Sequence, residues 1–446
     1  MLINISIDNF LSYNDKQELN MITSSKIQKM KEHKVVIKGT PILKHCAIYG
    51  ANAAGKSSLV KAFNFINEFV SKGFPSYGKE MYCRTNKDNA TRVSTFEITF
   101  VIDDIFYAYG FEAILKEGKI RREWLYKLKS DCTYKVLFER NNKQVQKGDG
   151  LNLPFSELTI MNNWISDYNL DSHKLFLTFI NEQAYGIENT KLRCLYDVFT
   201  WLTYGIDIYT PHMSKINLNH YSKPELLNKI KKIIKCFDVS ISDVFLKEVE
   251  ISEIEKEIEP EFYRNTINKL LSEKEDKPHV SMFNGKNYIK IECMPTGELK
   301  ALVLNFKHDK SDFDFTLAEE SDGTRRIFDF MHILLCDVPY KVFVVDELER
   351  SLHPKMTEAF IDLFDELHQD DKIQLIFTTH ESTIMSQEFF RRDEIWFVKK
   401  DEDNHSVIYP LDSYEDRYDK VLNRTYLCGG YGAVPNIRKY EEEDSE

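Results

Sequence analysis

The residues best suited to chemistry form a glycine-rich loop, Gly50-Ala-Asn-Ala-Ala-Gly55-Lys56-Ser57-Ser58, which follows the apolar run 45–49. Apolar residues recur at helical spacing after Ser57, so the loop is predicted to join a strand to the start of a helix. Backbone N–H groups at such a helix start bind phosphate, with Lys56 as the cation for β and γ oxygens and the Ser57 hydroxyl as a Mg²⁺ ligand. The residues predicted to contact the nucleotide are Gly50, Asn52, Gly55, Lys56, Ser57 and Ser58.

Two further polar groups follow apolar strands much later in the chain, the first of them about 290 residues after the loop. Asp346 and Glu347 end the run Lys341-Val-Phe-Val-Val, and His380 ends the run 374–379. Since ligands bind at the carboxyl ends of strands in α/β sheets, we expect these groups to meet the phosphate loop. Asp346 suits the Mg²⁺ shell, and Glu347 is placed to take a proton from an attacking water. His380 would bind a γ-phosphate oxygen or that water, although a histidine at a strand end is often structural.

A third segment, Ser321-Asp322-Gly323-Thr324-Arg325-Arg326, precedes the apolar helix predicted for 327–335. A serine and a glycine leading into a helix form a second candidate anion site, to which Ser321 and Gly323 would contribute. The alternative is an ordinary helix cap made by Ser321 or Thr324.

Composition limits the class of protein. The chain has 446 residues, of which 42% are hydrophobic, so it can bury a large core. Its net charge of −12 argues against a surface that wraps nucleic acid. The eight cysteines are scattered singly, which argues against a zinc knuckle or a disulfide framework. The sequence contains no run of 18 or more apolar residues, and its start, Met1-Leu-Ile-Asn-Ile-Ser-Ile, alternates like a strand without a basic leader, so we expect a cytoplasmic protein without a membrane span.

The pattern of elements predicts an α/β fold with a mixed β-sheet, interrupted by an α+β insertion domain. Strands are predicted at 2–7, 46–49, 94–102 and 105–112, the last two forming a hairpin around Asp103-Asp104. The predicted divisions are 1–114 for the N-terminal part of the α/β domain, 115–295 for the insertion domain and 296–446 for the C-terminal part of the α/β domain. No sustained seven-residue apolar repeat occurs in the insertion, so a coiled-coil arm is not expected.

The order of these motifs, with Glu349-Arg-Ser-Leu-His-Pro354 after Asp346-Glu347, resembles the ABC-type ATPase heads of the SMC, RecF and OLD families. The chain is more similar still to AAA-domain ATPases of bacterial abortive-infection and anti-phage loci, the RloA, AbiLii and PARIS-ATPase kind. Three further segments carry this likeness: Ile7-Asp-Asn-Phe10-Leu-Ser-Tyr13, Phe96 to Phe100 and Tyr431 to Pro435.

The resemblance implies an ATPase that uses ATP and Mg²⁺ and works as a homo-oligomer. In such heads one subunit holds ATP while the signature turn of a second subunit closes over the γ-phosphate, so Ser321 and Gly323 would act in trans. Asp322 departs from the glycine that is usual at its position, and it would need to point away from phosphate or pair with Arg325 or Arg326. Gln183 is a candidate for the glutamine-loop residue of such heads.

The leading hypothesis for function is an ATP-binding and slowly hydrolysing sensor subunit of an anti-phage, abortive-infection system. The sequence after His380 shows no second acidic cluster of the Toprim or metal-nuclease type, so the nuclease or toxin effector is expected from a neighbouring gene. A phage-derived molecule would be the trigger. Two alternatives stay open: a RecF-like or SMC-like DNA-repair ATPase whose insertion binds DNA directly, and an OLD-type nuclease that has lost its catalytic half.

Overall fold

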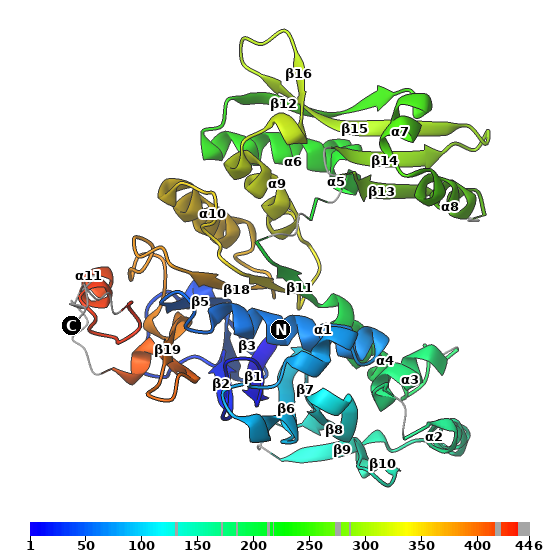
Figure 1. Ribbon diagram of the computed structural model, residues 1–446, viewed down its shortest axis with the longest axis vertical. Helices are drawn as coiled ribbons and strands as arrows, with labels where there is room; N and C mark the ends of the chain where they lie inside the picture. The colour runs from blue at the N-terminus through cyan, green and yellow to red at the C-terminus, as the bar shows by residue number, and fades with distance from the viewer. Residues whose placement is uncertain are drawn as a thin grey trace, which may run out of the picture. The chain divides into compact units, whose positions relative to one another are not determined.

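The computed structural model describes residues 1–129, 133–170, 173–183, 186–211, 215–216, 218–272, 278–284, 287–414 and 421–435. The chain divides into two compact units (Figure 1). Unit 1 comprises residues 1–211, 338–348 and 368–446, and unit 2 comprises residues 212–337 and 349–367. Each unit therefore contains segments that are distant in sequence.

A six-stranded mixed sheet forms the centre of unit 1. Its order is β11 (Ile206–Tyr209), β17 (Val342–Val345), β18 (Gln374–Thr379), β5 (His45–Gly50), β19 (Ile395–Lys400) and β20 (Ser406–Pro410). Neighbouring strands are parallel except for β20, which is antiparallel to β19. Strands β5, β17 and β18 are buried along their whole length, as continuous apolar runs in a parallel sheet require. The predicted α/β class and mixed sheet are confirmed.

The second sheet of unit 1 has seven antiparallel strands. Its order is β10 (Val145–Lys147), β9 (Tyr134–Arg140), β8 (Lys119–Leu128), β7 (Ile105–Ile114), β6 (Ser94–Ile102), β1 (Leu2–Asp8) and β2 (Gln17–Asn20). The predicted hairpin joins β6 to β7 through Asp103 and Asp104, whose φ angles are 47° and 59°. Positive φ at both central residues matches the turn type that the twist of a two-residue hairpin favours.

Helix α1 (Lys56–Lys72) packs between these two sheets (Figure 1). The ring of Phe65 lies 5.1 Å from that of Phe96 on β6, and Phe69 lies 4.9 Å from Phe111 on β7. The other helices of unit 1 are α2 (Phe155–Asp167), α3 (Phe176–Gln183), α4 (Arg193–Tyr204) and α11 (Leu422–Leu427), and a small hairpin pairs β3 (Lys34–Ile37) with β4 (Thr40–Leu43). One apolar core thus fixes the helix that begins at the phosphate loop.

Unit 2 contains a five-stranded antiparallel sheet. The strands are β12 (Ile241–Val249), β15 (Leu299–His308), β14 (Tyr288–Cys293), β13 (His279–Phe283) and β16 (Asp314–Thr316). Ile289 and Ile291 of β14 share an apolar cluster with α7 (Ile251–Glu257) and α8 (Pro260–Ser272), while Lys290 between them donates to Ser222 of α5 (Leu218–Ser222). Since side chains alternate along a strand, helices cover both faces of this sheet. Helices α6 (Pro224–Ile234), α9 (Asp322–Leu334) and α10 (Pro354–Leu367) complete the unit.

The compact units divide the chain at places other than the predicted domain limits. The predicted limit at 114/115 falls between β7 and β8, which are adjacent strands of one sheet. Residues 115–211 therefore belong with the phosphate-loop unit, and residues 296–337 belong with the preceding sheet in unit 2. Strand pairing decides the division, because β8 completes backbone hydrogen bonds of β7.

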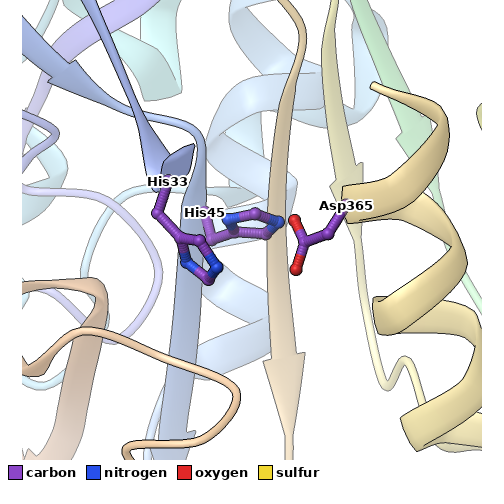
Figure 2. A group of neighbouring side chains, drawn as sticks. All are labelled: His33, His45 and Asp365. Carbon is purple, nitrogen blue, oxygen red and sulfur yellow. The ribbon is translucent and has the colours of Figure 1, made fainter. Parts of the chain in front are cut away.

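A buried charged cluster anchors the start of β5. Figure 2 shows the ring of His33 beside that of His45, with ring centroids 4.7 Å apart. Both histidines approach the fully buried carboxylate of Glu394, with Nδ1 to oxygen distances of 3.0 Å from His33 and 3.5 Å from His45. Burial raises the pKa of Glu394, but the two histidines outweigh burial and hold that pKa below its usual value. The carboxylate thus joins β5 to the segment before β19.

No helix in the described ranges is both long enough and apolar enough to cross a membrane.

Candidate functional site

A cavity of about 360 Å³ opens at the carboxyl edge of the six-stranded sheet. Its lining comes entirely from unit 1 and consists of Ser12, Asn52, Ala53, Ala54, Gly55, Lys56, Ser57, Ser58, Glu347 and His380. Strands β5, β17 and β18 run parallel, so the groups that follow them meet at one edge. This edge is where α/β sheets bind ligands, and the volume lies in the range of small-molecule sites.

Five of the six loop residues predicted to contact the nucleotide line this cavity, namely Asn52, Gly55, Lys56, Ser57 and Ser58. Gly50 instead closes the strand that leads to the loop, where a Cβ would lie 2.4 Å from the carbonyl oxygen of Val398 on β19. The loop needs left-handed backbone at Ala53 (φ 60°) and at Gly55 (φ 121°). The glycines therefore serve two different steric needs, close packing at Gly50 and backbone conformation at Gly55.

The Lys56 side chain is mostly buried and turns back over the loop. Its ammonium donates to the carbonyl oxygens of Gly50 at 2.8 Å and Ala51 at 3.2 Å. It also lies 3.0 Å from Nε2 of His380. An ammonium group can only donate, so a hydrogen bond between these two groups requires the His380 nitrogen as its acceptor. The structure thus brings His380 to Lys56, because β18 and β5 are adjacent parallel strands.

The two acidic residues after β17 share one contact, the hydroxyl of Thr378. Thr378 Oγ1 donates to Asp346 Oδ1 at 2.6 Å and accepts the Glu347 N–H at 2.9 Å. Glu347 has φ 51°, a conformation that costs a non-glycine residue about 1–3 kcal/mol and persists only when neighbouring contacts impose it. The Thr378 hydroxyl supplies one such contact, so strand β18 holds the Asp346 carboxylate and the Glu347 backbone that follow β17.

Ser57 and Asp346 offer the kind of oxygen ligands that a magnesium ion bound with a nucleotide takes, and of the two only Ser57 is among the residues that line the cavity. Mg²⁺ prefers oxygen ligands and is held by one or two carboxylate or hydroxyl groups plus substrate phosphate. Ser57 lines the cavity, and Asp346 is a carboxylate with 6% exposure whose orientation Thr378 fixes. Ser57 and Asp346 are therefore the residues that would hold the ion.

The segment Ser321 to Arg326, which carries the predicted signature turn, lies in unit 2. Helix α9 begins within it at Asp322, five residues earlier than predicted. Ser321 is the N-cap, and its hydroxyl oxygen accepts the Thr324 N–H at 3.2 Å. Asp322 is exposed and pairs with Arg325 at 2.7 Å, which is one of the two arrangements expected for this charge. A Cβ on Gly323 would lie 2.8 Å from the carbonyl oxygen of Ser351, so glycine is required by close packing. The structure thus contains the helix cap by Ser321 that is the alternative explanation for this segment, and anion binding by the segment stays a prediction.

Three hydroxyl residues near the loop were not found from the sequence: Ser12, Thr378 and Ser406. Ser12 lines the cavity, and Ser406 donates to the carbonyl oxygen of Ala54 within the loop. Isolated serines and threonines have no distinctive spacing, so only their tertiary contacts identify them. Gln183, the glutamine-loop candidate, lies exposed at the end of α3 and outside the lining of the cavity.

Comparisons with known proteins support the class of site. A protein-family model described as "AAA domain, putative AbiEii toxin, Type IV TA system" matches residues 46–386. No curated protein matches the sequence.

Several solved structures of SMC heads are similar at low identity. One is the SMC head bound to the C-terminal winged-helix domain of ScpA, with 13% identity and a TM-score of 0.40, covering 92% of this chain and 99% of that chain. A second is the SMC head domain from Thermotoga maritima, with 14% identity and a TM-score of 0.32, covering 92% and 98%. A third is the SMC head with an extended coiled coil bound to the C-terminal domain of ScpA derived from Pyrococcus furiosus, with 14% identity and a TM-score of 0.35, covering 92% and 97%.

The family match spans more than half of the chain and includes the phosphate loop, Asp346, Glu347 and His380. The chain therefore belongs to this family of AAA-domain proteins.

Proposed function

We propose that this protein binds ATP with Mg²⁺ and hydrolyses the ATP slowly to ADP and phosphate. The observation that carries the proposal is the cavity in unit 1, where the phosphate loop, Glu347 and His380 share one lining. A loop, a cation and a carboxylate at one edge of a parallel sheet are the parts that phosphoryl transfer to water needs.

Each residue of the site has a proposed role. Backbone N–H groups of the loop hold the phosphates, and the loop residues concerned include Gly50, Asn52, Gly55 and Ser58. Lys56 neutralises the negative charge of the phosphates. Ser57 and Asp346 hold the Mg²⁺ ion, which supplies charge neutralisation on the phosphate oxygens. Glu347 takes the proton of the attacking water, and the ring of His380 orients that water or a γ-phosphate oxygen.

We further propose that ATP joins two copies of the chain. Ser321 and Gly323 of one copy would contact the γ-phosphate held by another copy. The exposed ion pair of Asp322 with Arg325 supports this role, because the pair offsets the negative charge that Asp322 would bring to a phosphate. The protein would then be a homo-oligomer whose assembly depends on ATP.

In the cell, we propose a sensor and scaffold role in an anti-phage, abortive-infection system. A nuclease or toxin encoded by a neighbouring gene would be the effector, and a phage-derived molecule the trigger. The description of the matched family, which names the AbiEii toxin and a type IV toxin–antitoxin system, supports a role in this kind of locus.

Four substitutions test the site. Lys56→Ala should abolish ATP binding, and Glu347→Gln should keep ATP binding, lower turnover at least a hundredfold and accumulate an ATP-dependent oligomer. His380→Ala should lower turnover at unchanged ATP affinity. Ser321→Arg should block the oligomer without weakening ATP binding by the monomer. Glu388→Gln makes the same chemical change at an exposed carboxylate of unit 1 and is the control. Parental turnover in Glu347→Gln would remove Glu347 from the mechanism.

A second experiment tests the cellular role. Cells expressing the chain alone, its neighbouring gene alone or both are challenged with phage, and survival and phage yield are measured. Protection is expected only with both genes and only with an intact Lys56. Full protection by the chain alone would refute the separate effector. Tight, ATP-dependent DNA binding that weakens steeply with salt would instead favour the DNA-repair alternative.

A further inference from the structure

Ser406 lies directly behind the phosphate loop, although it is more than 340 residues away in sequence. It is the first residue of β20, and its side chain is 1% exposed. Its hydroxyl donates to the carbonyl oxygen of Ala54 at 2.5 Å and lies 2.8 Å from the hydroxyl of Ser12. The Ser406 N–H also donates to the carbonyl oxygen of Ser12 at 2.7 Å. Ser406 therefore joins the loop to the N-terminal segment.

The two serines occupy the space where the second glycine of the loop has no side chain. A Cβ placed on Gly55 would lie 2.2 Å from Ser406 Oγ and 2.8 Å from Ser12 Oγ. Both contacts are shorter than van der Waals packing allows, so the hydroxyl pair and Gly55 are fitted to each other. The glycine thus makes room for these hydroxyl groups as well as adopting a positive φ.

The bond from Ser406 also fixes the direction of a backbone N–H. The carbonyl of Ala54 and the N–H of Gly55 belong to one planar trans peptide, in which the two groups point in opposite directions. Holding the Ala54 carbonyl toward Ser406 therefore turns the Gly55 N–H away from β20. The loop also contains Ala53 in the left-handed region, which costs free energy and requires contacts that hold it.

A continuous set of hydroxyl contacts connects this point to the cavity wall. Ser12 Oγ lies 3.1 Å from Ser58 Oγ, and both residues line the cavity. Tyr13, next to Ser12, is fully buried and donates its hydroxyl to the carbonyl oxygen of Gly55 at 2.9 Å. Tyr13 of the N-terminal segment and Ser406 of β20 thus donate to successive carbonyl groups of the loop, and Ser12 contacts the side chains of Ser406 and Ser58.

We propose that Ser406, acting with Ser12, is a positioning residue that holds the phosphate loop in its phosphate-binding conformation. This inference rests on the proposed function, namely that the loop binds the phosphates of ATP. Ser406 contacts the loop from behind and acts on the nucleotide through the Ala54–Gly55 peptide. Its contribution belongs to the binding of the triphosphate and not to the chemical step.

Four variants test the proposal in the full-length chain: Ser406→Ala, Ser12→Ala, the double variant and Ser413→Ala. Ser413 is exposed in unit 1 and donates to the Pro410 carbonyl at 2.7 Å, so it controls for loss of a serine hydrogen bond. The dissociation constant of ATP with Mg²⁺ is measured by calorimetry, and KM, kcat and the melting temperature of the nucleotide-free chain are measured in parallel.

We expect ATP affinity to fall about tenfold in Ser406→Ala, since a buried carbonyl group loses its donor. KM should rise by a similar factor with kcat unchanged, which is the signature of lost ground-state binding. Ser406 and Ser12 act together on the Ala54–Gly55 peptide, so their effects on ATP affinity should not multiply. The double variant should also lose about tenfold in ATP affinity, well short of the product of the two single losses. Ser413→Ala should bind ATP like the parent chain.

Different results separate the inference from the proposed function. If the parent chain binds ATP and Ser406→Ala binds it equally well, the positioning role is refuted and the proposed function stands. A lower melting temperature at unchanged affinity would make Ser406 an ordinary contact of the fold and would also refute the role. If the parent chain binds no ATP, the proposed function fails, and the inference fails with it.

Discussion

Thr378→Val is the sharpest test of how the carboxylates of the site are held. The substitution keeps the size and branching of a fully buried side chain and removes only its hydroxyl. Two hydrogen bonds disappear, the one donated to Asp346 at 2.6 Å and the one accepted from the Glu347 N–H at 2.9 Å. A bond to a charged group contributes about 1.5–3 kcal/mol and a neutral bond about 1 kcal/mol. We therefore expect unit 1 to lose about 3 kcal/mol of unfolding free energy.

The neighbouring substitution Thr379→Val is a matched control. Thr379 is also fully buried on β18, but its hydroxyl oxygen accepts only the neutral Glu381 N–H at 2.9 Å among the bonds that the structure gives for it. Its loss should cost about 1 kcal/mol. The difference between the two variants, about 2 kcal/mol, isolates the contribution of the bond to the Asp346 carboxylate.

Guanidinium unfolding followed by tryptophan fluorescence measures both variants. All four tryptophans, Trp124, Trp164, Trp201 and Trp396, lie in unit 1, so the signal reports the unit that holds the site. ATP turnover should also fall at least tenfold in Thr378→Val, because Asp346 and Glu347 lose their common anchor. If both variants lose the same free energy and Thr378→Val retains parental turnover, the Thr378 hydroxyl is not the anchor of Asp346 and Glu347.

Two further predictions concern the rest of the fold. In Gly110→Ala the new Cβ would lie 2.3 Å from the Trp124 ring and 2.8 Å from the Phe96 carbonyl oxygen, so we expect a loss of about 1–3 kcal/mol in chemical unfolding. Adding Trp124→Leu should cost less than the sum of the two single changes, and strict additivity would contradict a direct clash. Burial, and to a smaller extent the neighbouring His332, lowers the pKa of His220 from 6.5 to about 4. Between pH 6.5 and pH 4 the unfolded chain therefore binds more protons than the folded chain, and the melting temperature should fall as pH decreases over this range. His220→Phe should show a shallower decrease over this range, and an unchanged pH profile would refute the assignment.

Sequence periodicity predicted the local structure around the site because its signals are local. The strand before Gly50, the helix after Lys56, the hairpin at Asp103 and the strands before Asp346 and His380 all occur where expected. The turn and loop positions follow from glycine and from short polar residues, whose backbone preferences do not depend on distant contacts. The same reasoning placed the start of α9 too late, because Asp322 to Arg326 carry no apolar face. The cap made by Ser321 sets that start.

The division into units could not be predicted from composition. Residues 115–211 change in pattern from the preceding strands, yet β8 pairs with β7 and closes the seven-stranded sheet. Strand β11 pairs in parallel with β17, although more than 130 residues separate them. Backbone pairing of this kind leaves little trace in side-chain type, so sequence pattern alone does not identify the partner strand.

The sequence by itself determined the chemistry that this protein can offer: a phosphate loop with Lys56 and Ser57, two carboxylates after a buried strand, and a histidine after the next one. These follow from residue type and spacing along single elements. Only the tertiary structure decided which hydroxyl groups contact that chemistry, namely Thr378 for the Asp346 carboxylate and the Glu347 backbone, and Ser406 with Ser12 for the loop. The physical reason is that a hydrogen bond requires groups within about 3 Å, a proximity that the packing of β5, β18 and β20 creates and that no spacing in the sequence encodes.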